Sequence, residues 1–342
     1  LALCIYVNSP PNILFSVVNF YPLNLMFMKK IALKLTALSL SFLFSNITSA
    51  EELSAKQSLD KMTQALDNLN YELAFVQTTP SNMDSFRYRH IKKDNKTYAQ
   101  LVTLDGRQQE IIQRDNLVSY FQPNTQAFTL NSGNIVDAMP AVVRADFDKL
   151  SSVYDFIKIG KDRVAGRFAD TIRIVPKDDF RYQYLVFVDE ENGLLLRGDM
   201  LDSEGKLLDQ FRVVTLYIDD RLRGLTEYIN KVSMPPLLKE SKNEQSSDIT
   251  WSAGWLPQGF SLIRYTQETL ENEVIDSALY SDGLFTFTLF VSNAGSNVLP
   301  ENTWKQGAYT IYSEVNGGKE ITFIGQLPIA AAKRIVQEVK FR

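Results

Sequence analysis

The sequence predicts a mainly β protein with an α+β part: a strongly curved, half-open antiparallel β-barrel wrapped on helices, followed by a smaller α+β domain. Short runs rich in aromatic and branched residues are separated by turn dipeptides such as Asp105-Gly106 and Asn192-Gly193, which is typical of an antiparallel meander. Helical periodicity is confined to a few places, and a polar, proline-bearing stretch after residue 229 divides the strands into two groups.

The first fifty residues have the features of a targeting segment. Met28-Lys29-Lys30 begins a secretory signal peptide at 28–50, whose apolar part runs over 31–47 and whose small residues Thr48-Ser49-Ala50 predict cleavage after Ala50. Residues 1–27 are interpreted as an upstream, non-native extension. A transmembrane anchor over 13–47 is the alternative, but it would place three lysines inside the apolar window.

Charge and composition narrow the class of function. Removing the signal takes three of the 36 Lys and Arg and none of the 40 acids, so the net charge falls from −4 to −7. This balance disfavours nucleic acid as a partner. The only cysteine, Cys4, also lies before the cleavage point, so no disulfide is expected.

The first domain, predicted over 51–222, begins with an amphipathic helix. Its start is marked by the capping box of Ser54 and Gln57, and apolar residues follow at helical spacing up to Leu69. Strands are then predicted at 71–78, 85–92, 96–104, 107–114, 117–122 and 126–130, short helices within 135–152, and further strands at 154–159, 163–176, 181–188, 194–201 and 206–217.

A linker is predicted at 223–248, and its polar, proline-bearing part, 230–248, shows no sustained period. The second domain, 249–342, has expected strands at 259–266, 277–281, 284–292, 308–314 and 320–325. A final helix begins near Pro328 and carries one apolar stripe.

The chemistry of catalysis is poorly represented. His90 is the one histidine, and it stands in an alternating strand pattern, so a catalytic triad or a histidine-rich metal site would have to depend on it alone. No dinucleotide fingerprint, P-loop or nucleophile elbow occurs in the sequence. We therefore predict a protein without enzymatic activity, cofactor or metal.

Several segments together resemble the RseB/MucB family of sigma-E regulators. In the first domain these are 164–167, 172–176, Arg181-Tyr182, 193–196, 201–205 and Gln210-Phe211. In the second they are 255–260, 280–284 and 324–328. The resemblance covers essentially the whole chain after the signal peptide and does not extend to residues 1–27.

The resemblance implies a periplasmic, negative regulator of the envelope-stress response. Its large domain would have the half-open barrel of the carriers LolA and LolB. It would bind the periplasmic domain of the anti-sigma factor RseA, protect that domain from the protease DegS, and be released by lipopolysaccharide or lipid-like signals. The residues leave open which RseA segment is bound, which lipid acts, and whether the chain forms a homo-oligomer.

Two sets of candidate site residues follow. The partner-binding set lies in the second domain, where the resemblance implies the partner contact, and its aromatic and amphipathic residues are of the kind that favour interfaces: Trp255, Phe260, Arg264, Tyr280 and Asp282. The lipid-cavity set consists of aromatic and apolar strand residues, whose inward face alternation alone does not fix: Phe75, Tyr88, Tyr98, Leu101, Tyr120, Phe128, Tyr184 and Phe187.

Two other functions compete with this interpretation. A periplasmic lipid or lipoprotein carrier of the LolA type would need only the barrel, and the second domain on its polar linker favours a protein partner instead. An envelope hydrolase built on His90 would need a nucleophile beside that residue.

Overall fold

The fold was analysed in a computed structural model, which describes residues 53–136, 139–218, 222–238, 249–270, 273–295 and 301–342. The predicted signal peptide and upstream extension therefore lie outside the described residues. Helix α2 (Ala55–Asn68) begins with the expected capping box, in which the Ser54 hydroxyl accepts from the Gln57 amide and the Gln57 side chain accepts from the Ser54 amide. Its apolar face, with Leu59 and Met62 fully buried, packs into the core of the first domain.

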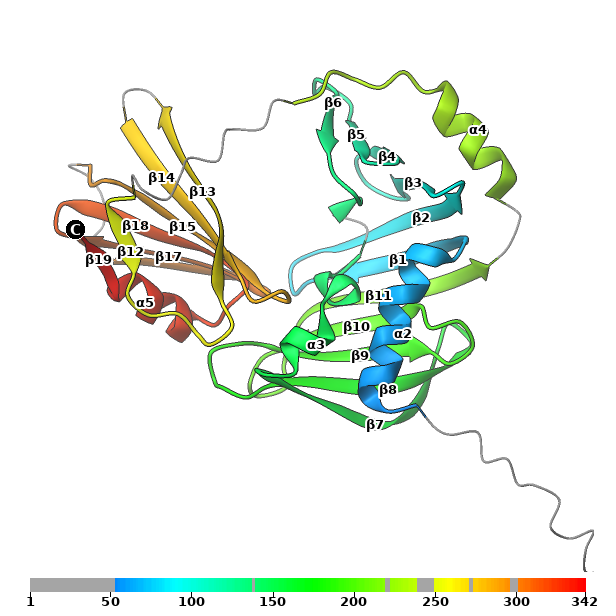
Figure 1. The fold of residues 1–342 in the computed structure, drawn as a ribbon, viewed down its shortest axis with the longest axis horizontal. Coiled ribbons are helices and arrows are strands. Elements are labelled where there is room, and N and C mark those ends of the chain that lie inside the picture. The colour runs from blue at the N-terminus through cyan, green and yellow to red at the C-terminus, as the bar shows by residue number, and fades with distance from the viewer. Residues whose placement is uncertain (1–52, 137–138, 219–221, 239–248, 271–272, 296–300) are drawn as a thin grey trace, which may run out of the picture. The chain divides into compact units, whose positions relative to one another are not determined.

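Eleven strands form one open antiparallel sheet, which confirms the predicted meander (Figure 1). They are β1 (Tyr71–Thr78), β2 (Met83–Lys93), β3 (Lys96–Thr103), β4 (Glu110–Arg114), β5 (Leu117–Phe121), β6 (Phe128–Asn131), β7 (Tyr154–Val164), β8 (Arg167–Pro176), β9 (Gln183–Asp189), β10 (Leu195–Leu201) and β11 (Leu207–Ile218). The order β6-β5-β4-β3-β2-β1-β11-β10-β9-β8-β7 leaves β6 and β7 as edges, so the sheet is not a closed barrel.

One face of this sheet packs on helices. Tyr71, Leu73 and Phe75 alternate along β1 toward that face and join one core with α2, the 3₁₀ helix η2 (Ala141–Arg144) and helix α3 (Phe147–Leu150). Helix α2 contacts β7, β9, η2 and α3. The predicted short helices within 135–152 are thus confirmed, and they separate β6 from β7 in the chain.

The first part of the predicted linker differs from expectation. Residues 223–231 form helix α4 (Arg223–Lys231), and Leu225 and Ile229 pack with Ile91 and Ile112 on the opposite face of the sheet. The chain then runs back along β6, where the Thr129 amide donates to the Pro236 carbonyl over 2.9 Å. The apolar spacing of 222, 225 and 229 is the helical signal that the polar composition of the segment concealed.

The second domain is a six-stranded antiparallel sheet with one helix. Its order is β13 (Ser261–Leu270), β14 (Glu273–Ser281), β15 (Thr286–Asn293), β18 (Lys319–Gly325), β17 (Tyr309–Asn316) and β16 (Glu301–Gln306). Helix α5 (Ile329–Gln337) covers β17 and β18, and β12 (Trp251–Ala253) pairs with β19 (Val339–Phe341). This is the expected α+β domain, with β12, β16 and β19 added to the predicted strands.

Candidate functional site

The turn between β14 and β15 carries Asp282, one of the predicted partner-binding residues. Its Oδ1 atom accepts hydrogen bonds from the backbone amides of Leu284 and Phe285 over 2.9 and 2.7 Å. Gly283 has a φ of +94°, which a side chain would strain. The Asp-Gly dipeptide therefore fixes this hairpin locally.

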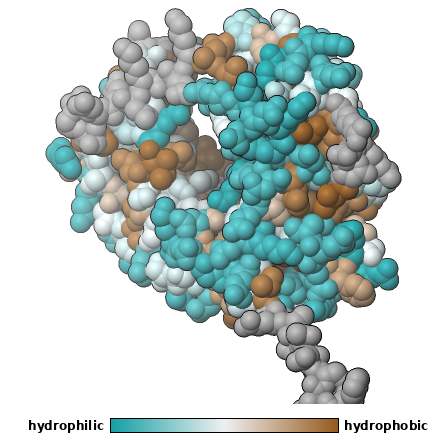
Figure 2. Space-filling model, turned by 45° about the vertical axis from the view of Figure 1, so that its right-hand side comes forward, coloured by the Kyte–Doolittle hydropathy of each residue, from teal (hydrophilic) through white to brown (hydrophobic). Residues whose placement is uncertain are grey.

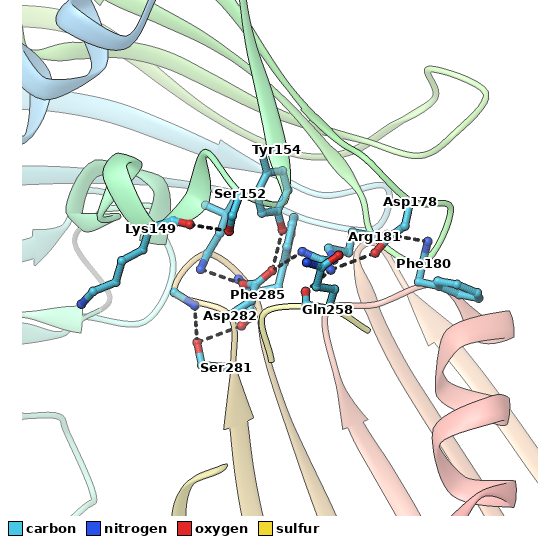
Figure 3. Close-up of polar contacts among 12 residues, drawn as sticks. Lys149, Ser152, Tyr154, Asp178, Phe180, Arg181, Gln258, Ser281, Asp282 and Phe285 are labelled. Carbon is cyan, nitrogen blue, oxygen red and sulfur yellow. Dashed lines mark hydrogen bonds and ion pairs between the residues drawn. The ribbon is translucent and has the colours of Figure 1, made fainter. Parts of the chain in front are cut away.

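The second oxygen of Asp282 is bound from the first domain (Figure 3). Oδ2 accepts from the Tyr154 hydroxyl over 2.6 Å and from Arg181 Nη1 over 3.1 Å, and both side chains of the ion pair are fully buried. Arg181 Nη2 donates to Asp178 over 2.8 Å and to the Gln258 carbonyl. We call Tyr154, Arg181 and Asp282 the buried triad.

The surroundings of the triad are aromatic. The Arg181 guanidinium lies over the rings of Tyr154 and Phe260, at 5.2 and 5.4 Å from their centroids. Burial and the neighbouring Asp282 carboxylate raise the pKa of Tyr154, so its hydroxyl stays protonated as a donor. Removing one partner of a buried ion pair strongly destabilises the folded chain, because the other charge is left buried without compensation.

The other aromatic members of the predicted partner-binding set are also engaged inside the chain. Trp255 packs edge-on against Phe180 with centroids 4.7 Å apart, and the Arg334 guanidinium lies 3.9 Å from the Trp255 ring. Phe260 and Tyr280 both contact Phe287, at centroid distances of 5.3 and 5.1 Å.

Arg264 is the exposed member of the set. It lies on β13, which pairs with β14 and is an edge strand among the described residues, beside the exposed Leu262 and Ile263. Of the five predicted partner-binding residues, four are therefore engaged in contacts within the chain: Trp255, Phe260, Tyr280 and Asp282. Arg264 lies on the surface.

A cavity of about 500 Å³ lies on the inner face of the large sheet, within the usual range for ligand sites. Its lining residues come from both domains: Gln77, Thr79, Asn82, Asp84, Val136, Met139, Pro140, Ala141, Tyr184, Gly198, Met200, Asp209, Phe211, Thr286, Tyr309 and Gln326. Of the eight predicted lipid-cavity residues, Tyr184 alone lines it.

The other predicted cavity residues take different positions. Phe75, Tyr88 and Leu101 are buried in the helix-covered core, and Tyr120 stacks on Phe128 with centroids 4.9 Å apart. Tyr98 packs on the opposite face of the sheet, against the apolar cluster that contains Leu225 and Ile229 of α4. Phe187 alternates with Tyr184 along β9, so the two face opposite sides, and the Arg197 guanidinium covers the Phe187 ring at 4.8 Å.

Exposed apolar side chains do not form one continuous surface on the face shown in Figure 2. That face is mainly hydrophilic, and hydrophobic residues gather in separate patches. Among the described residues, no helix has both the length and the apolar character needed to cross a membrane.

His90 is a structural residue. It is buried on β2, its Nδ1 lies 2.8 Å from the Leu69 carbonyl oxygen, and its ring stacks on Tyr71. Burial lowers its pKa. Within the described part of the chain, no group of three or more His, Cys, Asp or Glu side chains could hold a metal ion.

Comparison with known proteins agrees with this architecture. The family model for the MucB/RseB N-terminal domain matches residues 54–238, and the model for the MucB/RseB C-terminal domain matches 245–340. The chain belongs to the MucB/RseB family. The sigma-E factor regulatory protein RseB of Haemophilus influenzae is 92% identical over 315 residues, covering 92% of this chain and 100% of that protein. RseB of Escherichia coli K12 is 38% identical over 317 residues, covering 92% and 99%.

A solved relative shares the MucB/RseB fold. The crystal structure of MucB in complex with MucA(peri) superposes with a TM-score of 0.69 at 22% identity, covering 84% of this chain and 99% of that one.

Tyr154 and Arg181, the first-domain residues that bind Asp282, were not predicted from the sequence. Tyr154 and Arg181 lie 128 and 101 positions from Asp282, so no local pattern connects them. Asp209 offered a signal, because it shares the inward parity of Phe211 and Val213 on β11. An acid at an inward strand position is unusual.

Proposed function

We propose that this chain is a negative regulator of the sigma-E envelope-stress response that works in the periplasm. One observation carries the proposal: a protein with 92% identity over its whole length is a sigma-E factor regulatory protein. The two family models, which match in the expected order, agree with it. The predicted signal peptide supports export. The proposed role is regulatory and non-enzymatic, as the family of the relatives suggests.

The proposed partner is the periplasmic domain of an RseA-type anti-sigma factor. The solved complex of a relative is named as MucB with MucA(peri), which supports a partner of this kind. Bound chain would cover the partner segment that DegS cleaves, so the cleavage rate would fall as occupancy rises. Lipopolysaccharide or a lipid-like signal would lower the affinity and expose the segment, through a coupling that must be reciprocal.

The roles proposed for the predicted partner-binding residues differ with their burial. Arg264, exposed on an edge strand, is proposed to contact the partner directly. Trp255, Phe260, Tyr280 and Asp282 are proposed to position that surface, since their side chains are engaged within the chain. A partner strand added at the β13 edge would supply backbone hydrogen bonds to the outer side of this strand, which is unpaired within the described part of the chain.

Protease protection tests the proposed function. The chain from Glu51 onward is titrated into the cognate anti-sigma factor's periplasmic domain in the presence of activated DegS. We expect the cleavage rate to fall to a small residual value at saturation and to recover when purified lipopolysaccharide is added. An unchanged rate at chain concentrations that saturate binding, or no binding at all, would contradict the proposal.

A further inference from the structure

The cavity on the inner face of the large sheet has two acidic residues in its described lining. Asp84 and Asp209 both contribute to it, and among the described residues that line it none is Lys or Arg. The register explains how they meet. Asp84 pairs with Gln77 and Gln77 with Phe211, while Asp209 pairs with Met200, which pairs with Tyr184. Two adjacent rows of inward side chains therefore form the floor.

The two carboxylates have different surroundings. Asp84 is exposed at the rim and accepts from the Asn82 amide over 2.5 Å. Asp209 is half-buried, and burial raises its pKa while the backbone amide of Gln210 acts in the opposite direction. A carboxylate desolvated without a cation costs free energy in the folded chain. A ligand that supplies the cation removes that cost.

The apolar part of the lining defines the shape of the ligand further. Met139, Met200 and Phe211 line the same cavity as Asp209, and Gly198, across from Phe211, adds no side chain to the floor. A long aliphatic stem ending in a positive charge satisfies both parts of this lining, because lysine and arginine bury their methylenes and keep the head group polar. An acyl chain would leave the Asp209 carboxylate desolvated and unpaired.

We propose that this cavity binds a lysine or arginine side chain of the protein partner, with Asp209 as the residue that pairs with its positive charge. The proposal rests on the proposed function, and it adds a chemical requirement for the bound segment. Charge complementarity selects the occupant: a cavity whose described lining holds two carboxylates and no basic residue favours a cationic group and rejects an anionic one.

The test is a double-mutant cycle between the cavity and the partner. Binding of the cognate anti-sigma factor's periplasmic domain is measured by calorimetry for the wild-type chain, Asp209→Asn, and the rim control Asp84→Asn. Each Lys and Arg of the partner is replaced in turn by Gln. We expect Asp209→Asn to weaken binding about tenfold or more and Asp84→Asn to change it by less than about threefold.

One partner residue should show coupling. Its replacement by Gln should weaken binding to the wild-type chain by a similar factor and have little further effect on Asp209→Asn. The inference would be overturned if Asp209→Asn bound the partner as tightly as the wild-type chain does. It would also be overturned if the effect of Asp209→Asn on affinity and the effect of each basic replacement in the partner were fully additive. Failure of the wild-type chain to bind the partner would instead overturn the proposed function.

A competition arm separates the two sources of a cationic group. Vesicles of phosphatidylethanolamine carry an alkylammonium head group, whereas phosphatidylglycerol vesicles do not. We expect neither to displace the partner from the cavity. Displacement by phosphatidylethanolamine that disappears in Asp209→Asn would assign the cavity to a lipid amine and would overturn the proposal.

Discussion

Asp282 and Asp209 are both withdrawn from solvent, and their surroundings are opposite. The Asp282 carboxylate is fully buried and its acceptors are filled, with two backbone amides on one oxygen and Tyr154 and Arg181 on the other. Asp209 is half-buried, lines a cavity, and has a raised pKa because burial is not offset by a cation. The contrast teaches that a buried acid whose acceptors are filled within the chain holds the fold, whereas one left unpaired in a cavity is available to a ligand.

Removing the saturated acid should have the largest effect. Asp282→Ala leaves Arg181 buried without its main partner, so we expect the free energy of unfolding to fall by about 3–5 kcal/mol in a urea titration. The matched control is Asp178→Ala, which removes the more exposed carboxylate on the same arginine and should cost about 1 kcal/mol. A smaller loss for Asp282→Ala than for Asp178→Ala would contradict the structural role of the triad.

Tyr280 tests whether a predicted partner-binding residue acts through packing. Its ring is buried and stacks on Phe287, so Tyr280→Ala should lower the free energy of unfolding by about 3 kcal/mol. Arg264→Ala, on the exposed edge strand, should change it by less than about 0.5 kcal/mol. Thermal unfolding of both variants checks this, and equal stability of the two would show that Tyr280 is available for direct contact.

The local features of this fold could be predicted from the sequence. The Ser54 capping box, the inserted helices after residue 135 and the Asn192-Gly193 turn depend on neighbours in the chain, and all are present in the structure. Strand β16 was not predicted because every residue in it is exposed, so burial imposes no alternation.

The features that position the site could not be obtained in this way. The buried triad joins residues more than a hundred positions apart, and the cavity is assembled from strands of both domains. Aromatic residues are enriched both in cores and in interfaces. Residue type alone therefore could not show that most of the predicted lipid-cavity residues lie in the core. Face assignment requires the register, which becomes visible only in the sheet.

The Tyr154 hydroxyl allows a smaller change to be made in the buried triad. Tyr154→Phe removes the hydroxyl that donates to Asp282 over 2.6 Å and keeps the ring under the Arg181 guanidinium. Because the acceptor is charged, we expect the free energy of unfolding to fall by about 1.5 kcal/mol. Tyr184→Phe serves as a control, since the Tyr184 hydroxyl makes no hydrogen bond within the described residues, and a loss of equal size there would argue against a specific role for Tyr154.

The smallest effect is expected at Asp209, and it has the opposite sign. A carboxyl whose pKa is raised by folding destabilises the folded chain when ionised, so Asp209→Asn should be as stable as wild type or more stable at pH 7. The advantage should shrink as the pH falls through the raised pKa toward the unfolded value, because wild-type Asp209 then becomes neutral. Urea titrations at pH 7 and pH 4 check this, and a variant less stable than wild type at pH 7 would show that the carboxylate is paired within the fold.

Measuring unfolding free energy and partner affinity on the same three proteins tests the central claim most directly. The account predicts that Tyr154→Phe lowers the free energy of unfolding while binding the anti-sigma factor's periplasmic domain with an affinity close to that of the wild-type chain. It predicts that Asp209→Asn keeps its stability and loses about tenfold or more in affinity. If Asp209→Asn bound the partner as tightly as the wild-type chain, or lost stability and affinity together, the distinction between the saturated and the unpaired acid would be wrong.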